Sequence, residues 1–406
     1  MPGIATAQSV QSQPGLTLDQ AVAAAGGSAP ASEAASADVA AARAGRTVAG
    51  LRPNPGAQGQ VENVIGSGPY SGVRSAETTV GFAIPIELGG KRGARVAVAE
   101  AQLSRAELRA AITAADVRLQ VTQLYIGAVA AERRLTNARD QVRIAGEASR
   151  VAHVRVRAGR ASPLEEQRAE VARVNADANL ERLTRLADTA RANLTRRIGR
   201  PIDGPLDAGL LDRIPETTYG PANPVRADGT LALAAADADL TVADADIRLA
   251  RANRVPDLSV GPALRRLEAT NDTAAVFSVS IPIPLFNSGN AAVAQATAER
   301  TRADAQRRVI ALDVEQAIAD VQAEAANALT TARATAGPAL AAAQEGARIA
   351  RIGYREGKFG QLDLLDAERT LADTRIADVD ALSAYHDARA RLERLSARAP
   401  LMETPR

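Results

Sequence analysis

The order of apolar and polar positions along the chain predicts long helices interrupted by short stretches of strand. From about residue 88 to residue 157 the chain keeps a helical pattern and contains no proline. A helix of that length would span ~105 Å at a rise of 1.5 Å per residue, more than a compact domain accommodates. A first helix is predicted over about 16–49, with a candidate break at Gly26-Gly27, and another from the turn at 159–163 to about residue 198.

A period of two marks the predicted strand of the first half. Val80, Phe82, Ile84 and Ile86 are apolar, whereas the residues between them are threonine, glycine, alanine or proline. Such alternation indicates a strand with one apolar face. Lipid-facing residues of transmembrane β-barrels alternate in this way, and so do the residues of a half-buried strand in a soluble sheet. The pattern predicts strands within about 51–87 and leaves both environments open.

The second half repeats this plan. A helix over about 228–253 is expected to be followed by strands near 257–267 and 275–286, a helical pattern over about 288–355 and a last helix over about 361–397. The strand sequence Val80–Ile86 matches Phe277–Ile283, and Gly159 matches Gly357 at nearly the same offset. The apolar residues expected on one face of the second strand are Phe277, Val279, Ile281 and Ile283. We infer an internal duplication of one helix–strand–strand–long helix–helix unit.

The duplication, together with a stretch rich in proline and glycine, predicts the organisation of the chain. The expected parts are a disordered N-terminal segment over 1–16, a first repeat over 17–198, a linker over 199–226, a second repeat over 227–398 and a C-terminal tail over 399–406. The N-terminal segment contains Ala5-Thr6-Ala7, which fits the end of a signal peptide. The alternative is an ordinary polar N-terminus.

Composition narrows the possible functions. The 49 basic residues nearly balance the 47 acidic ones, so the sequence has no nucleic-acid-binding footprint. There is no cysteine, and the only histidines are His153 and His386, too few for a thiolate or imidazole metal site within one chain. No catalytic or nucleotide-binding motif stands out. We therefore expect a protein that is not an enzyme and has no cofactor, with His153 at the surface and His386 in a structural role.

The number of predicted strands limits the kind of membrane barrel that the chain can form. About four strands per chain cannot close a membrane barrel, because single-chain barrels of this kind start at eight. Open strand edges are not tolerated in lipid, since each unpaired N–H and C=O costs several kcal/mol. If the strands lie in a membrane, several chains must share one barrel, and three chains would supply twelve strands. The predicted fold class is mainly α with a small β part, in which long helices continue a shared barrel.

Three stretches resemble the TolC-like outer-membrane factor family, over about residues 16–397. They are Ile84-Pro-Ile-Glu-Leu-Gly-Gly-Lys-Arg92, Ile281-Pro-Ile-Pro-Leu-Phe-Asn287 and Tyr354-Arg-Glu-Gly-Lys-Phe-Gly-Gln-Leu-Asp-Leu-Leu-Asp-Ala367. The first is similar to the heavy-metal, CzcC-type branch. The resemblance implies a homotrimer with a twelve-stranded barrel in the outer membrane of a Gram-negative bacterium and a long α-helical barrel in the periplasm. It also implies a periplasmic adaptor (membrane fusion protein) and a proton-driven inner-membrane pump of the RND type as partners.

The same resemblance suggests site residues. Asp363 and Asp366 match the acidic pair that narrows the periplasmic end of the channel, and Glu165 is the first-half counterpart of Asp363. Rings of carboxylates in a narrow lumen favour cations. The helix-hairpin tips expected to contact the adaptor contain Gly159, Leu164, Gly357 and Leu362. The residues expected to face outer-membrane lipid are Val80, Phe82, Ile84, Ile86, Phe277, Val279, Ile281 and Ile283. An ordinary solvated acidic face is the alternative for the Asp pair.

The resulting hypothesis is a passive exit duct of a tripartite efflux system for divalent heavy-metal cations. A multidrug efflux or type I secretion channel would have the same architecture. A different class, the soluble periplasmic coiled-coil scaffold, stays open as well. It predicts unstructured linkers in place of the strands at 51–87 and 256–286.

Overall fold

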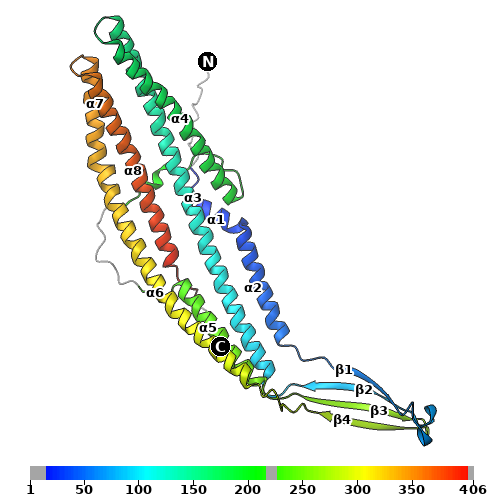
Figure 1. Cartoon of the computed structure of the whole chain (residues 1–406). Helices are drawn as coiled ribbons and strands as arrows, with labels where there is room; N and C mark the ends of the chain where they lie inside the picture. The colour runs from blue at the N-terminus through cyan, green and yellow to red at the C-terminus, as the bar shows by residue number, and fades with distance from the viewer. Residues whose placement is uncertain (1–14, 216–225, 401–406) are drawn as a thin grey trace, which may run out of the picture. The chain divides into compact units, whose positions relative to one another are not determined.

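A computed structural model describes residues 15–215 and 226–400, and the chain there is mainly helical with one small sheet (Figure 1). The helices are α1 Leu18–Ser28, α2 Pro30–Ala49, α3 Lys91–Arg157, α4 Pro163–Ile198, α5 Leu231–Ala252, α6 Asn290–Ala334, α7 Leu340–Arg355 and α8 Gln361–Leu395. The strands are β1 Gly56–Glu62, β2 Glu77–Ile86, β3 Leu258–Leu267 and β4 Asp272–Ser280. The predicted fold class and the repeated order of helix, two strands, long helix and helix are confirmed.

Local sequence signals explain several helix boundaries. Thr17 caps α1, where its hydroxyl accepts the backbone N–H of Gln20. Ser162 caps α4 in the same manner, and Pro163 follows at the first helical position, where its missing N–H is not needed. Gly199 ends α4 in the left-handed conformation, with φ of 78°.

The four strands form an antiparallel sheet in the order β1-β2-β3-β4. Residues directly opposite each other lie on the same face. Ile84 is paired with Val260, and Val260 with Val279, so one apolar face runs without interruption across β2, β3 and β4. Within the described chain, β1 and β4 each have one edge that no other strand covers. This sheet contradicts the scaffold hypothesis, which predicted linkers in its place.

The chain divides into two compact units, each built from both sequence halves. Unit 1 comprises Met1–Ala34, Ala111–Leu231 and Asp313–Arg398, and unit 2 comprises Ala35–Ala110, Ala232–Leu312 and Ala399–Arg406. The main apolar core of unit 1 surrounds Tyr125, whose hydroxyl donates a hydrogen bond of 2.5 Å to the Leu16 carbonyl and accepts one of 3.0 Å from the Asp207 N–H. The start of the described chain and the segment after α4 are both held against α3 by this side chain.

Three predicted helix and strand boundaries need correction. The strand expected over 275–286 ends at Ser280, because Pro282 and Pro284 have no N–H for a ladder hydrogen bond. Ile281 and Ile283 therefore follow β4. The first helix breaks at Ala29 and not at Gly26-Gly27, since Pro30 begins a new helix. A π-helical turn, Thr335–Ala339, interrupts the helix expected over 288–355, because it contains Pro338.

Parts of the predicted linker and termini lie outside the described residues, namely 216–225, 1–14 and 401–406. The described part of the linker is packed: Leu206, Leu210 and Leu211 are buried, and Leu206 forms a β-bridge with Leu16. Leu16, which was expected to be disordered, is therefore part of the ordered structure. No helix in the described part of the chain has an apolar stretch long enough to span a membrane.

Candidate functional site

The two helix hairpins of unit 1 end in matched turns. Gly159 lies between α3 and α4, and Gly357 lies between α7 and α8, with φ of 69° and 76°. Each turn closes with a backbone bond across six residues, from Arg160 to the Arg155 carbonyl and from Lys358 to the Gly353 carbonyl, both 2.8 Å. This is the Schellman pattern, which needs a left-handed residue at the glycine position. A side chain at either glycine would meet no neighbour, so backbone conformation alone favours glycine.

An exposed leucine follows each turn at an equivalent place. Leu164 and Leu362 are the second residues of α4 and α8, and they are 55% and 63% exposed. Each of these leucines therefore leaves more than half of its surface accessible to solvent in the single chain. The adaptor contact expected from the sequence stays a prediction.

Asp363 and Asp366 have different surroundings at the start of α8. Asp363 accepts the backbone N–H of Gly360 at 2.9 Å and so helps to cap the helix. Asp366, one turn further on, is exposed and makes no hydrogen bond or ion pair with any other residue that the structure describes. Both side chains are solvent-accessible, but only Asp366 has a fully uncommitted carboxylate.

Glu165 is engaged in contacts with the second hairpin, and its expected place in the constriction stays a prediction. Its carboxylate is only 16% exposed, lies 3.6 Å from the Arg155 guanidinium and accepts the Tyr354 hydroxyl at 2.6 Å. Its backbone carbonyl accepts the Gln361 amide at 2.5 Å. In this chain Glu165 therefore joins the two hairpins, and it is not a free carboxylate beside Asp363 and Asp366.

Tyr354 is the centre of this contact between hairpins, and sequence reasoning missed it. The side chain is 2% exposed, and the Arg155 guanidinium lies 4.6 Å from the centre of its ring. Arg155 also donates to the Tyr354 carbonyl at 3.0 Å. Burial and the Glu165 carboxylate raise the pKa of the Tyr354 hydroxyl, so it stays a hydrogen-bond donor. The only signal in the sequence was the place of Tyr354 in the motif before Gly357.

A cavity of about 620 Å³ adjoins this contact in unit 1. Its lining includes Ile144, Val151, Arg155, Tyr354, Leu364 and Glu368. Arg351 closes one side and donates to the Glu368 carboxylate at 2.9 Å. The hairpin region therefore combines a polar contact with a recess lined by both apolar and charged side chains.

The apolar strand residues form the second candidate surface, in unit 2. Val80, Phe82, Ile84 and Ile86 are all exposed on one face of β2, and Phe277 and Val279 continue that face on β4. Phe277 is 80% exposed. Ile281 and Ile283 are also exposed, although they lie beyond the strand. An apolar face of this extent, uncovered in a single chain, marks an interaction surface.

The opposite face of the sheet is mainly polar or small, with Val276 and Leu267 as the larger apolar exceptions. Gln58, Gln60, Thr79, Arg265, Ser278 and Ser280 all belong to it. Arg265 lies 2.7 Å from the Glu77 carboxylate and 3.1 Å from that of Glu62, so its charge is balanced. The sheet thus separates an apolar face from a polar one, as a wall between lipid and water would.

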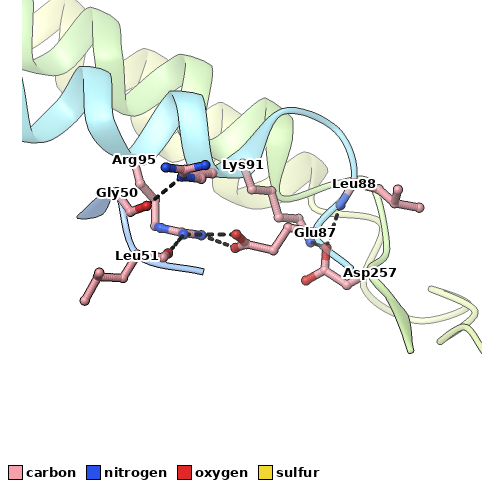
Figure 2. A network of polar contacts seen from close by, with 8 residues as sticks. Gly50, Leu51, Glu87, Leu88, Lys91, Arg95 and Asp257 are labelled. Atoms are coloured by element: carbon pink, nitrogen blue, oxygen red, sulfur yellow. Dashed lines mark hydrogen bonds and ion pairs between the residues drawn. The ribbon is translucent and has the colours of Figure 1, made fainter. Parts of the chain in front are cut away.

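Figure 2 shows the corner where β2 leads into α3. The Lys91 ammonium lies 2.7 Å from the Asp257 carboxylate, which also accepts the Leu88 N–H at 3.1 Å. Arg95 forms two hydrogen bonds to Glu87. These bonds from Lys91 and Arg95 hold the pKa values of Asp257 and Glu87 below their usual range. The motif that resembles the heavy-metal branch therefore has a structural role at this corner.

The two histidines have different hydrogen-bond partners. His386 is buried, with Nε2 at 3.1 Å from the Leu211 carbonyl, and burial lowers the pKa of its imidazole. His153 is half-exposed beside Glu166, at 2.6 Å. Within the described ranges, no three His, Cys, Asp or Glu side chains are grouped to hold a metal ion.

Comparison with known proteins gives a consistent result. The profile of the outer membrane efflux protein family matches residues 23–200 and 228–398. The cobalt-zinc-cadmium resistance protein CzcC of Cupriavidus metallidurans is 31% identical, over 94% of this chain and 90% of that protein. The nickel and cobalt resistance protein CnrC of the same organism is 30% identical, over 69% of this chain and 67% of that protein. The crystal structure of CusC has a similar fold, with a TM-score of 0.79 at 17% identity, covering 94% of this chain and 92% of that chain.

Proposed function

Because the chain belongs to the outer membrane efflux protein family, we propose that it is the outer-membrane exit duct of a tripartite efflux system for divalent heavy-metal cations. The cargo class is cobalt, zinc, cadmium and nickel. The observation that carries this assignment is the 31% identity to a cobalt-zinc-cadmium resistance protein along nearly the whole of both chains. The chain is a passive conduit in this proposal, and no enzymatic step is assigned to it.

The duct is a homotrimer. One chain offers two open sheet edges, β1 and β4, which lipid would not tolerate. Pairing β4 of each chain with β1 of the next closes a barrel of about twelve strands, well above the minimum of eight. The apolar face with Val80 and Phe277 then contacts lipid, and the polar face with Thr79 and Arg265 lines the lumen.

The hairpin ends meet the other components of the system. Leu164 and Leu362 provide two equivalent apolar contacts for a periplasmic adaptor, which connects the duct to an RND-type pump of the inner membrane. In the trimer, Asp363 and Asp366 of three chains bring six carboxylates to the same end. Such rings attract cations and repel anions, which suits a metal cargo. Asp366 contributes most, since it has no partner in the described part of the chain.

A deletion and complementation experiment tests the proposal. The gene is deleted from its host, and the strain is complemented with the full-length gene together with its upstream region. Growth is then measured against cobalt, zinc, cadmium and nickel salts, and separately against bile salts, dyes and antibiotics. Outer-membrane fractions are assayed for the trimer in every strain, so that a growth defect is compared at equal expression.

We expect sensitivity to the divalent metals, restored by complementation, and no change towards the amphipathic compounds. Sensitivity to the amphipathic compounds alone would replace the metal cargo with a multidrug one. A metal-resistant deletion strain that fails to export a protein substrate would instead favour a secretion channel. Absence of the protein from the outer membrane would contradict the duct itself.

A further inference from the structure

Five arginines near the corner of unit 2 have no carboxylate partner among the described residues. They are Arg52, Arg92, Arg248, Arg251 and Arg254, and all five are exposed. The other two cations of this region are committed, because Lys91 pairs with Asp257 and Arg95 with Glu87 (Figure 2). The five arginines are called the basic girdle below.

Local contacts bring the basic girdle together. Arg92 donates to the Gly50 carbonyl at 2.6 Å, which puts the start of α3 beside the segment that contains Arg52. Gly89 packs directly against Ala252 and Val255, so the end of α5 adjoins the same corner. Arg248 and Arg251 are three residues apart in the last turns of α5, which places them on neighbouring positions of its surface, and Arg254 follows in the turn after the helix.

The basic girdle lies immediately beyond the apolar sheet face. Ile86 and Leu258 are paired at the level where β2 ends and β3 begins. Arg254 precedes Leu258 by four residues, and Arg92 follows Ile86 by six. The headgroup region adds only about 5–8 Å to each side of a hydrocarbon core of about 30 Å, so a few residues are enough to cross from one to the other.

The far end of the sheet has no comparable excess of positive charge. Arg265 there is paired with Glu62 and Glu77, and Arg266 lies 3.8 Å from the Glu268 carboxylate. At this end of the sheet, Arg74 is the one arginine without an acidic partner among the described residues. Unpaired positive charge is therefore concentrated at the end of the sheet that leads into the helices.

We propose that the basic girdle binds the phosphate groups of anionic phospholipids in the leaflet next to the helices. The inference rests on the proposed function, because it requires the sheet to lie in the outer membrane. Arginine suits this role, since its planar guanidinium donates two parallel hydrogen bonds to a phosphate. The exposed apolar residues of β2 and β4 cover the acyl chains of the same lipids. The occupant is thus a lipid with both an anionic headgroup and a hydrocarbon tail.

The test measures lipid preference of the purified, detergent-solubilised full-length protein. Fluorescent phosphatidylglycerol and phosphatidylcholine with identical acyl chains are titrated against it. The variant R248Q/R251Q/R254Q removes three charges from the basic girdle. The matched control R43Q/R74Q/R302Q removes three exposed charges from elsewhere in unit 2, none of which has a carboxylate partner among the described residues. A second variant, R52Q/R92Q, leaves α5 unchanged, so the inference can still be tested if the first variant misfolds.

We expect the wild type and the control to bind phosphatidylglycerol about fivefold or more tightly than phosphatidylcholine, and both girdle variants to lose most of that preference. Salt should weaken the preference, since exposed charges are screened. Equal binding of the two lipids by the wild type, or an equal loss in the control, would overturn the inference. So would displacement of the lipid by inorganic phosphate at equal concentration, which indicates a small-anion site.

The outcome is separable from that of the proposed function. A girdle variant that reaches the outer membrane, restores metal resistance and still prefers the anionic lipid overturns the inference alone. A wild-type protein absent from outer-membrane fractions overturns the proposed function, whatever it binds in detergent.

Discussion

The Tyr354 hydroxyl lies 2.6 Å from the Glu165 carboxylate, across 189 residues of sequence. The bond joins the start of α4 to the end of α7, so it ties one helix hairpin to the other near their turns. Both side chains are largely withdrawn from solvent. A buried hydrogen bond to a charged group is among the stronger polar contacts, because its loss leaves a desolvated carboxylate.

Tyr354→Phe should therefore loosen the hairpin ends. The variant removes the donor and keeps the ring under Arg155, with an expected loss of about 1–2 kcal/mol in the contact. We expect faster hydrogen exchange at both hairpin ends and a higher single-channel conductance of the reconstituted trimer. Glu165→Gln retains an acceptor and should give a smaller change. Tyr70→Phe, at an exposed tyrosine, is the control. An unchanged conductance for Tyr354→Phe would show that the contact between Tyr354 and Glu165 does not affect gating.

The charge at the start of α8 predicts cation selectivity. Asp366→Asn removes an exposed carboxylate without breaking any hydrogen bond within the described residues, so folding should be unaffected. We expect the reversal potential of the channel in a salt gradient to shift towards lower cation selectivity. Asp320→Asn removes another exposed charge, from α6, and should leave the potential unchanged. Equal shifts in both variants would mean that overall charge, and not the proposed constriction, sets the selectivity.

The ion pairs at the corner between β2 and α3 predict that the stability of the protein depends on pH in the acidic range. Hydrogen bonds from Arg95 and Lys91 depress the pKa values of Glu87 and Asp257 in the folded protein. The stability that these pairs contribute is present above the ordinary carboxylate pKa of about 4 and is lost as the pH falls through the depressed values. The temperature at which the trimer unfolds should therefore fall steeply below about pH 4. In the double variant Glu87→Gln and Asp257→Asn this part of the profile should flatten, and an unchanged profile would assign the acid sensitivity to other carboxylates.

The sequence predicted features that repeat at a short period. The alternation of Val80, Phe82, Ile84 and Ile86 is visible because each exposed strand face imposes it on successive residues. The helices were predicted for the same reason. The π-helical turn at Pro338 was missed because the helical pattern resumes at once on its far side.

The contacts that build the candidate sites could not be predicted in this way. Glu165 and Tyr354 meet only because two hairpins pack together, and Lys91 and Asp257 meet only because two strands are paired. Neither contact leaves a periodic signal. Glu165 was placed in the predicted constriction as the first-half counterpart of Asp363 in the family resemblance, and that match carries no information on whether a buried hydroxyl will bind it.

Arginine substitutions on the two faces of β4 should have opposite effects on membrane insertion. Val279 lies on the apolar face and is 71% exposed, whereas Ser280, the next residue, lies on the polar face. Val279→Arg should disturb membrane insertion by about 2–4 kcal/mol if the residue lies near the bilayer midplane, and by less near its edge. Ser280→Arg adds the same charge to the side proposed to face water and should be tolerated. The measurement is the yield of heat-resistant trimer in outer-membrane fractions, and equal yields for the two variants would contradict the proposed lipid-facing side.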